Sequence, residues 1–167
     1  LDIRCPPGSQ PRADIVLVVD RSNSMSGSKL EDAKAAAAAF VTALELGRHQ
    51  VALVSFSDMA TLDQPLTDAP SEIRSAIAAV HAHGGTDIAV ALDLALRHLA
   101  DAGRPGALGV VLLLTDGEPT GLGQPYVDPV RLGGRARAAG VLVYTIGLGV
   151  NVDADLLVAV AGARARY

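Results

Sequence analysis

The chain has 167 residues and a formal net charge of −4; half of its residues are hydrophobic and 3% are aromatic. This length suits one ordinary domain with a sizeable core better than two. The basic residues are scattered, so the sequence offers no positive patch for nucleic acid or for an anionic membrane surface. No apolar run approaches the roughly 18 residues that a membrane span needs. We therefore expect a soluble domain without membrane insertion, with a core of Ala, Val, Leu and Ile.

The first segment, residues 1–12, contains three prolines and one glycine, which fix turns and remove backbone donors. We expect it to be an extended arm before a domain that occupies residues 13–167. Cys5, the one cysteine of the sequence, lies in this arm. Two interpretations stay open for it: a free surface thiol, or a disulfide to a cysteine outside this sequence, which is the pairing we predict for the intact protein.

Four short apolar runs along the chain predict strands that are buried on both faces, because none alternates polar with apolar residues. These runs are residues 15–19, 51–56, 110–114 and 141–148. Residues 60–67 predict a further strand at an edge of the sheet, because Pro65 has no backbone N–H for a central position.

Helical spacing of apolar residues predicts helices in most of the segments that separate or follow these runs. The expected ranges are 28–46, 71–80, 86–103, 128–140 and 153–161. Gly47 and Gly103 are interpreted as helix ends, and Gly133 and Gly134 as residues that weaken the fourth helix. The alternation of strands and helices predicts an α/β fold: a doubly wound, mostly parallel sheet with helices on both faces and a Rossmann-like arrangement.

Ligands of such folds collect where the loops leave the carboxyl ends of the strands. Three segments converge on this edge: DRSNS at 20–24, GGTD at 84–87 and LLTDGEP at 113–119. They supply two carboxylates and three hydroxyls, from Asp20, Ser22, Ser24, Thr86 and Asp116. Hard divalent cations prefer oxygen ligands and usually keep several waters. The set predicts a site for Mg²⁺, with Mn²⁺ or Ca²⁺ as alternatives.

Other interpretations of these residues fit less well. An EF-hand loop would need Gly at the position of Met25, and a phosphate-binding loop would need a Gly upstream of GSK at 27–29. A haloacid-dehalogenase-like enzyme would need a second Asp where Ser22 stands. Each segment alone could be only a helix cap or a turn, but three at one sheet edge is improbable. His81 and His83 have no third ligand at a spacing that suits zinc.

With Asp20, Ser22 and Ser24 in one loop, Thr86 in GGTDI and Asp116 in LLTDGEP, the sequence from about residue 13 onward resembles the von Willebrand factor type A domain family and its metal-ion-dependent adhesion site. The resemblance implies a protein-binding module rather than an enzyme. It also implies that a Glu or Asp of the partner completes the coordination of the metal.

The same resemblance assigns roles to the five residues. Ser22 and Ser24 would ligate the ion directly, Thr86 and Asp116 would exchange direct and water-mediated contacts, and Asp20 would mainly orient waters and hydroxyls. Asn23, Asp87 and Glu118 are expected on the rim that faces the partner. Asn23 stands where many relatives have Gly, and Asn enters left-handed backbone conformations more easily than most residues.

The family usually continues with one more strand and a last helix after the helix expected at 153–161. By this resemblance the domain at 13–167 is C-terminally incomplete. The leading functional hypothesis is an adhesion-type module that binds proteins through a metal, extracellular or on the surface of a bacterium-like cell, with its oligomeric state left open. The alternative is a cytoplasmic accessory domain of an ATP-driven assembly such as a chelatase; the arm with Cys5 favours the first.

Overall fold

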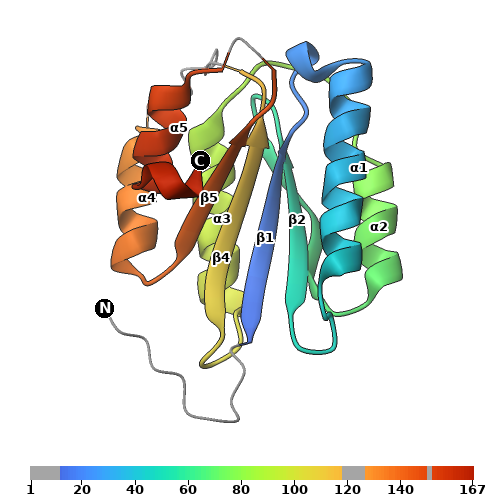
Figure 1. The fold of residues 1–167 in the computed structure, drawn as a ribbon, viewed down its shortest axis with the longest axis vertical. Helices are drawn as coiled ribbons and strands as arrows, with labels where there is room; N and C mark the ends of the chain where they lie inside the picture. Colours follow the sequence, from blue (N-terminus) through green and yellow to red (C-terminus); the bar gives the residue numbers. More distant parts are fainter. Residues whose placement is uncertain (1–11, 118–126, 150–151) are drawn as a thin grey trace.

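The computed structural model describes residues 12–117, 127–149 and 152–167. They form a five-stranded sheet with the strand order β3-β2-β1-β4-β5 and helices on both faces (Figure 1). The predicted α/β fold with a doubly wound, mostly parallel sheet is therefore confirmed. The predictions for Cys5 and Glu118 lie outside the described residues.

The central strand β1 pairs in parallel with β2 and β4, and β4 pairs in parallel with β5. The parallel strands are β1 (Ala13–Asp20), β2 (Gln50–Phe56), β4 (Leu108–Thr115) and β5 (Leu142–Gly147). The strand β3 (Ala60–Thr67) lies at an edge of the sheet, as the position of Pro65 predicted, and runs antiparallel to β2. The carboxyl ends of β1 and β4 consequently lie side by side.

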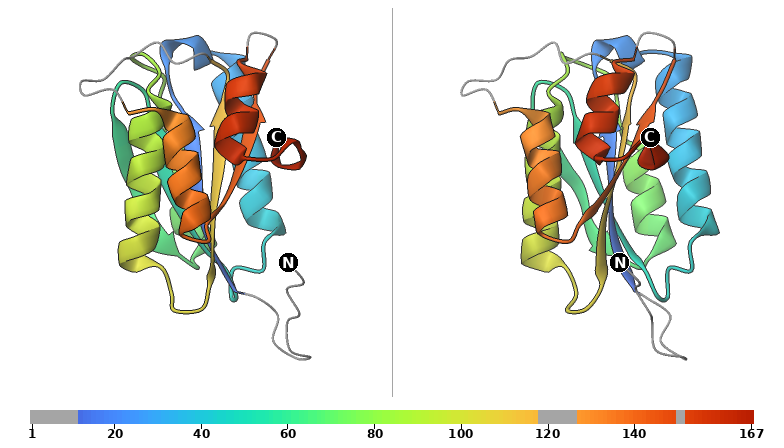
Figure 2. Two further views of the ribbon diagram at one scale, coloured as in Figure 1. Left: turned by 90° about the vertical axis from the view of Figure 1, so that its left-hand side faces the viewer. Right: turned by 60° about the vertical axis from the view of Figure 1, so that its left-hand side comes forward.

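Five α-helices and two short 3₁₀ turns connect and follow the strands among the described residues. They are α1 (Ser28–Ala43), α2 (Pro70–Ala78), α3 (Ile88–Ala102), α4 (Pro129–Ala138), α5 (Ala154–Ala161), η1 (Asn23–Met25) and η2 (Arg164–Arg166). Figure 2 shows α1 and α2 on one side of the sheet and α3, α4 and α5 on the other. No helix among the described residues combines the length and the apolar character that crossing a membrane requires.

The buried strand β1 contributes to two hydrophobic cores. Ile15 and Leu17 pack with side chains of α1 and α2, whereas Val16 and Val18 pack with side chains of α3 and α4. Because successive side chains of a strand point to opposite faces, a strand between two helical layers is apolar at every position. This explains why the sequence of β1 does not alternate between polar and apolar residues. The same packing on both faces holds the carboxyl end of β1 in place.

Two helix predictions need correction. Helix α1 ends at Ala43 rather than at residue 46, because Leu44 is extended and Leu46 turns back into the core of α1 and α2. Gly133 does not break α4: a Cβ at this position would overlap the carbonyl oxygen of Val160 in α5, so the glycine lets the two helices approach closely. The bounds of the other helices and of the strands lie within about two residues of the prediction.

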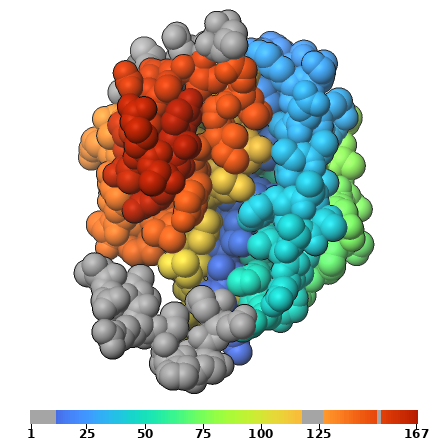
Figure 3. Space-filling model, in the orientation of Figure 1, coloured from blue at the N-terminus to red at the C-terminus, as the bar shows by residue number. Residues whose placement is uncertain are grey.

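The prediction that β5 is buried on both faces is wrong. Val143 and Thr145 are buried, but Tyr144 and Ile146 on the opposite face are 37% and 42% exposed. That face belongs to the side covered by α1 and α2, and these helices lie over β1 and β2 instead. In Figure 3 part of β4 is visible between α1 and β5.

Candidate functional site

The loop after β1 turns sharply at the carboxyl edge of the sheet. Ser22 is extended and precedes the 3₁₀ turn η1, whose Met25 is fully buried and anchors the loop. Gly27 then takes a positive φ of 83° just before α1, a conformation that other residues rarely adopt. The Ser22 and Ser24 side chains therefore cap no α-helix: the residue before α1 is Gly27, and no side chain caps it.

Asp20 is completely buried at the end of β1. Its Oδ1 accepts a hydrogen bond from the backbone N–H of Ser22 at 2.8 Å, and its Oδ2 accepts one from the Thr115 hydroxyl at 2.5 Å. Burial raises the pKa of the Asp20 carboxyl, the hydrogen bonds from Thr115 and Ser22 counteract this, and the nearby Asp116 carboxylate adds to the rise. Thr115 was not identified from the sequence, although a polar residue that ends an apolar strand beside an Asp is a usable signal.

A chain of hydroxyl groups links the loop after β1 to the end of β4. Ser22 Oγ lies 2.9 Å from Ser24 Oγ, and the Ser24 hydroxyl donates to Asp116 Oδ1 at 2.8 Å. Because the single hydrogen of Ser24 is used by Asp116, Ser22 is the donor in the serine pair. Hydrogen bonds thus connect Ser22, Ser24 and Asp116, which are three of the five residues predicted for the metal site.

Thr86 is buried beside this chain of hydroxyls. A Cβ placed on Gly117 would lie 3.7 Å from Thr86 Oγ1 and 3.8 Å from Ser24 Oγ, so both hydroxyls border the same small space. The loop of Thr86 is held there by backbone hydrogen bonds. The N–H of Asn23 donates to Gly84 O at 3.0 Å, and the N–H of Asp87 donates to Ser57 O at 2.8 Å.

Asp116 is buried and forms an ion pair that the sequence analysis missed. Lys29 Nζ lies 2.5 Å from Asp116 Oδ2; the side chain of Lys29 is 46% exposed and that of Asp116 is 1% exposed. Lys29 lies in the first turn of α1, where the helix dipole disfavours a cation. A lysine in the first turn of a helix that begins next to a predicted acidic site is a sequence signal that could have identified this ion pair.

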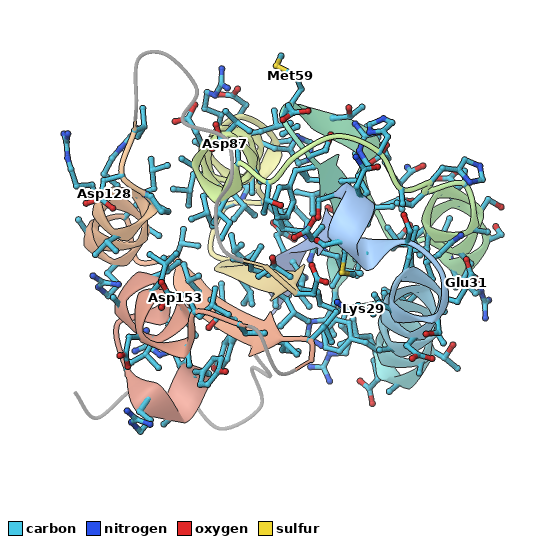
Figure 4. The ribbon with its side chains drawn as sticks, turned by 90° about the horizontal axis from the view of Figure 1, so that it is seen from above. Lys29, Glu31, Met59, Asp87, Asp128 and Asp153 are labelled. Atoms are coloured by element: carbon cyan, nitrogen blue, oxygen red, sulfur yellow. The ribbon has the colours of Figure 1, made fainter. Side chains whose placement is uncertain are left out.

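The three predicted rim residues fare differently. Asn23 is exposed, and its backbone is not left-handed, since no described residue other than glycine has a positive φ. Asp87 is buried and its Oδ1 accepts from the N–H groups of Ala89 and Val90 at 3.0 and 3.2 Å, so it caps α3 rather than facing a partner. Figure 4, which looks down on this edge, shows Asp87 at the start of α3. Glu118 lies outside the described residues.

His83 is engaged in local polar contacts. Its Nε2 lies 2.7 Å from Arg21 Nη1, and its Nδ1 lies 3.3 Å from Ser57 Oγ. Among the described residues no group of three or more His, Cys, Asp or Glu side chains could hold a metal. A metal at this edge would therefore depend on hydroxyl oxygens in addition to carboxylates.

The donor set fits a hard divalent cation. All five predicted residues offer oxygen, and the described contacts bring Ser22, Ser24, Thr86 and Asp116 around one space, with Asp20 bound to the backbone of Ser22. Two carboxylates provide the charge and the hydroxyls provide neutral ligands, a combination that suits Mg²⁺.

Comparison with known proteins identifies the family. The model of the von Willebrand factor type A domain matches residues 14–167. Inter-alpha-trypsin inhibitor heavy chain H4 of Homo sapiens is 31% identical over 151 residues, which make up 84% of this chain and 16% of that protein. The chain thus spans about a sixth of the length of this curated relative.

Solved structures agree with this match. Proximal thread matrix protein 1 from the mussel byssus has a TM-score of 0.78 and 27% identity, and the match covers 93% of this chain and 40% of that one. In that structure the motif of the metal-ion-dependent adhesion site (MIDAS) is occupied by zinc. A von Willebrand factor type A protein from Catenulispora acidiphila has a TM-score of 0.79 and 23% identity, with 90% of this chain and 36% of that one covered. The second likeness is one of fold alone.

Proposed function

Because the chain belongs to the von Willebrand factor type A domain family, we propose that it is a metal-dependent protein-interaction module that binds an exposed Glu or Asp of a partner. The observation that carries the proposal is the hydrogen-bonded link from Ser22 through Ser24 to Asp116, which joins two separate loops at one point. Hydroxyls that meet a buried carboxylate in this way are ready to share a cation. The zinc-occupied motif of the mussel relative supports a metal at the corresponding site.

The proposed ligands have distinct roles. Ser22, Ser24 and Thr86 would offer hydroxyl oxygens, and Asp116 a carboxylate oxygen. Asp20, already bound to Thr115 and to the backbone of Ser22, would hold the loop in place and orient water. A bound ion would supply Lewis acidity for an anionic oxygen of the partner. We propose Mg²⁺ as the physiological ion, with Mn²⁺ or Ca²⁺ as substitutes.

The charge of the site favours an acidic partner. Asp20 and Asp116 carry two negative charges, which balance a divalent ion, and Asp20, already bound to Thr115 and to the backbone of Ser22, would act on the ion through water. An ion with one carboxylate contact through water keeps enough electrophilicity to attract a carboxylate and to repel a basic side chain. Ser24, Asn23 and Lys29 are exposed at this edge, so a protruding side chain of a partner can reach it.

Calorimetry with Mg²⁺, Mn²⁺, Ca²⁺ and Zn²⁺ tests the metal site. We expect one ion to bind to the wild type, and Asp116→Ala to weaken binding by about 10- to 100-fold. Asp128→Ala is the control, because Asp128 is an aspartate with a hydrogen-bonded carboxylate, at the start of α4 and apart from the ends of β1 and β4 (Figure 4). Equal affinity in the wild type and Asp116→Ala would remove Asp116 from the site.

Partner chemistry is tested with Mn²⁺-loaded protein and two short peptides that differ only in Glu or Gln. We expect the Glu peptide to displace metal-bound water, which lowers the relaxation enhancement of water protons, and the Gln peptide to leave it unchanged. Thr86→Ala and EDTA treatment should both abolish the effect. Undiminished binding of the Glu peptide after EDTA treatment would show that acidic groups dock elsewhere.

We further propose that the module acts outside the cell or at its surface. The mussel relative is a thread matrix protein of the byssus, which supports a setting outside the cell. Cys5 would then be available for a disulfide in an oxidising compartment. Alkylation of the intact protein under non-reducing conditions tests this: a freely alkylated Cys5 would contradict it.

A further inference from the structure

The ion pair between Lys29 and Asp116 has an unusual position. The ammonium of Lys29 lies 2.5 Å from Asp116 Oδ2, while Asp116 Oδ1 accepts the hydrogen bond of Ser24. Both oxygens of a proposed metal ligand are therefore engaged, one by a hydroxyl and one by a cation. Figure 4 shows Lys29 at the start of α1, beside the ends of the central strands.

The two buried carboxylates at this edge are balanced unequally. Asp116 has Lys29 as its counter-ion, whereas the contacts that the described residues make with Asp20 come from the neutral Thr115 hydroxyl and Ser22. Without an ion, the pair of carboxylates plus Lys29 keeps one excess negative charge. With a divalent ion, the same groups carry one excess positive charge, and Lys29 then faces a second cation.

Lys29 is well placed to leave. Its side chain is 46% exposed, and its long flexible stem can carry the ammonium into water at little cost in solvation. Its place in the first turn of α1 works in the same direction, because the positive end of the helix dipole repels it. The contact with Asp116 is thus a local attraction that a stronger cation can replace.

We propose that Lys29 is a tethered counter-ion that competes with the divalent ion for Asp116. The inference rests on the proposed function and adds a residue that sets its metal affinity. In the metal-free protein Lys29 neutralises Asp116 and stabilises the loop; when the ion binds, Lys29 must give up or weaken this contact. The competition is reciprocal. The free energy by which Lys29 stabilises the metal-free protein is lost when the ion binds, and it reduces the free energy of metal binding by the same amount. The result is a site whose affinity for the ion is lower than it would be without Lys29.

The test compares Mn²⁺ binding by calorimetry at low ionic strength in the wild type, Lys29→Met and Lys34→Met. Lys34 is a matched control: it lies on the same helix and pairs with Glu31 at 3.2 Å, away from Asp116. We expect Lys29→Met to bind Mn²⁺ about tenfold more tightly, the scale of one partly screened charge pair. Lys34→Met should stay within about twofold of the wild type.

Thermal unfolding gives a second readout that does not depend on metal affinity alone. In EDTA, Lys29→Met should melt at a lower temperature than the wild type, because Asp116 loses its counter-ion. Added Mn²⁺ should then raise the melting temperature of Lys29→Met by more than that of the wild type. If Lys29→Met does not fold, Lys29→Gln carries the same comparison.

The outcomes are distinct. Equal or weaker Mn²⁺ binding in a folded Lys29→Met would overturn the competition and leave the proposed function intact, with Lys29 as a support for Asp116. Failure of the wild type and of all variants to bind Mn²⁺ would overturn the proposed function itself, and the inference with it. Tighter binding in Lys29→Met alone, with Lys34→Met unchanged, is the result that supports the inference.

Discussion

Strand β1 carries a buried aspartate near each end, and the two are treated in opposite ways. Asp14 and Asp20 are 1% and 0% exposed. Asp14 is enclosed by Arg104: its Oδ2 accepts from the backbone N–H at 2.5 Å, and its Oδ1 accepts from Nε at 2.8 Å. The same guanidinium donates to the carbonyl oxygens of Ala13 and Arg48, both at 3.1 Å.

Asp20 receives hydrogen bonds from neutral groups of Thr115 and Ser22.

The charge of Asp14 is neutralised by another residue of the chain and stabilises the fold, whereas the charge of Asp20 is available to a bound ion. The buried Asp14 carboxylate is compensated within the chain, because the guanidinium of Arg104 binds one of its oxygens and the backbone N–H of Arg104 binds the other. Asp20, and Asp116 beside it, depend on hydroxyls and on a half-exposed lysine, so their compensation is incomplete and replaceable. We infer that the amino end of β1 is a permanent ion pair, and that the carboxyl end is completed by an exchangeable cation.

Loss of the ion pair between Asp14 and Arg104 should have the largest effect on stability. Arg104→Met leaves Asp14 buried without a counter-ion, and we expect the free energy of unfolding in urea to fall by about 3 kcal/mol. Mn²⁺ affinity of the folded variant should be unchanged, because Arg104 lies at the opposite end of β1. Arg97→Met, which removes an exposed arginine paired with Asp93, is the control and should cost about 0.5 kcal/mol or less. A loss below about 1 kcal/mol in Arg104→Met would refute this account of the amino end.

A smaller effect is expected from Asp87, a buried aspartate that lies near the proposed site but serves the fold. Asp87→Ala removes the cap of α3 and should lower the free energy of unfolding by about 1 kcal/mol. Calorimetric Mn²⁺ affinity should stay within about twofold of the wild type, in contrast to the loss expected for Asp116→Ala. Were Asp87→Ala to abolish Mn²⁺ binding, Asp87 would belong to the site and not only to the helix.

The smallest effect concerns the pH dependence of the metal-free protein. Burial raises the pKa of Asp20 above its ordinary value of 3.8, so its contribution to stability is fully present below that value and is lost as the pH rises through the folded-state pKa. In EDTA the wild type should therefore lose stability relative to Asp20→Asn as the pH rises from acidic to neutral. Urea unfolding across this range measures it. Only the slope is informative, since the Asn side chain also alters the hydrogen bond with Ser22. Parallel curves would show that Asp20 is compensated as fully as Asp14.

Much of the fold could be predicted because its signals are local. An apolar run that ends in Asp20 indicates a buried strand and places a carboxylate at the edge where ligands bind in this class of fold. The alternate positions of Ser22 and Ser24 indicate that their hydroxyls belong together, and the structure places them 2.9 Å apart. Pro65 likewise indicated that β3 lies at an edge.

The exposed face of β5 shows where local signals end. The sequence of β5 is apolar throughout most of its length, and nothing in it distinguishes Tyr144 and Ile146, which are exposed, from Val143, which is buried. The distinction depends on which strands α1 and α2 cover, a property of the whole arrangement. In the same way Asp87 could have faced a partner or capped a helix, and only the start of α3 decides for the cap.

The sequence by itself determined the elements, their order and the oxygen-rich edge, because hydrophobic periodicity and strand ends are encoded within a few neighbouring residues. Only the tertiary structure decided the charge balance of that edge. Lys29 meets Asp116 across 87 positions of the chain, and Thr115 meets Asp20 across 95. Such pairs depend on the strand order, which brings β1 beside β4, and on the place of α1 above their ends. No local pattern carries that information, because a hydrogen bond or ion pair forms between whichever side chains the packed elements bring within reach.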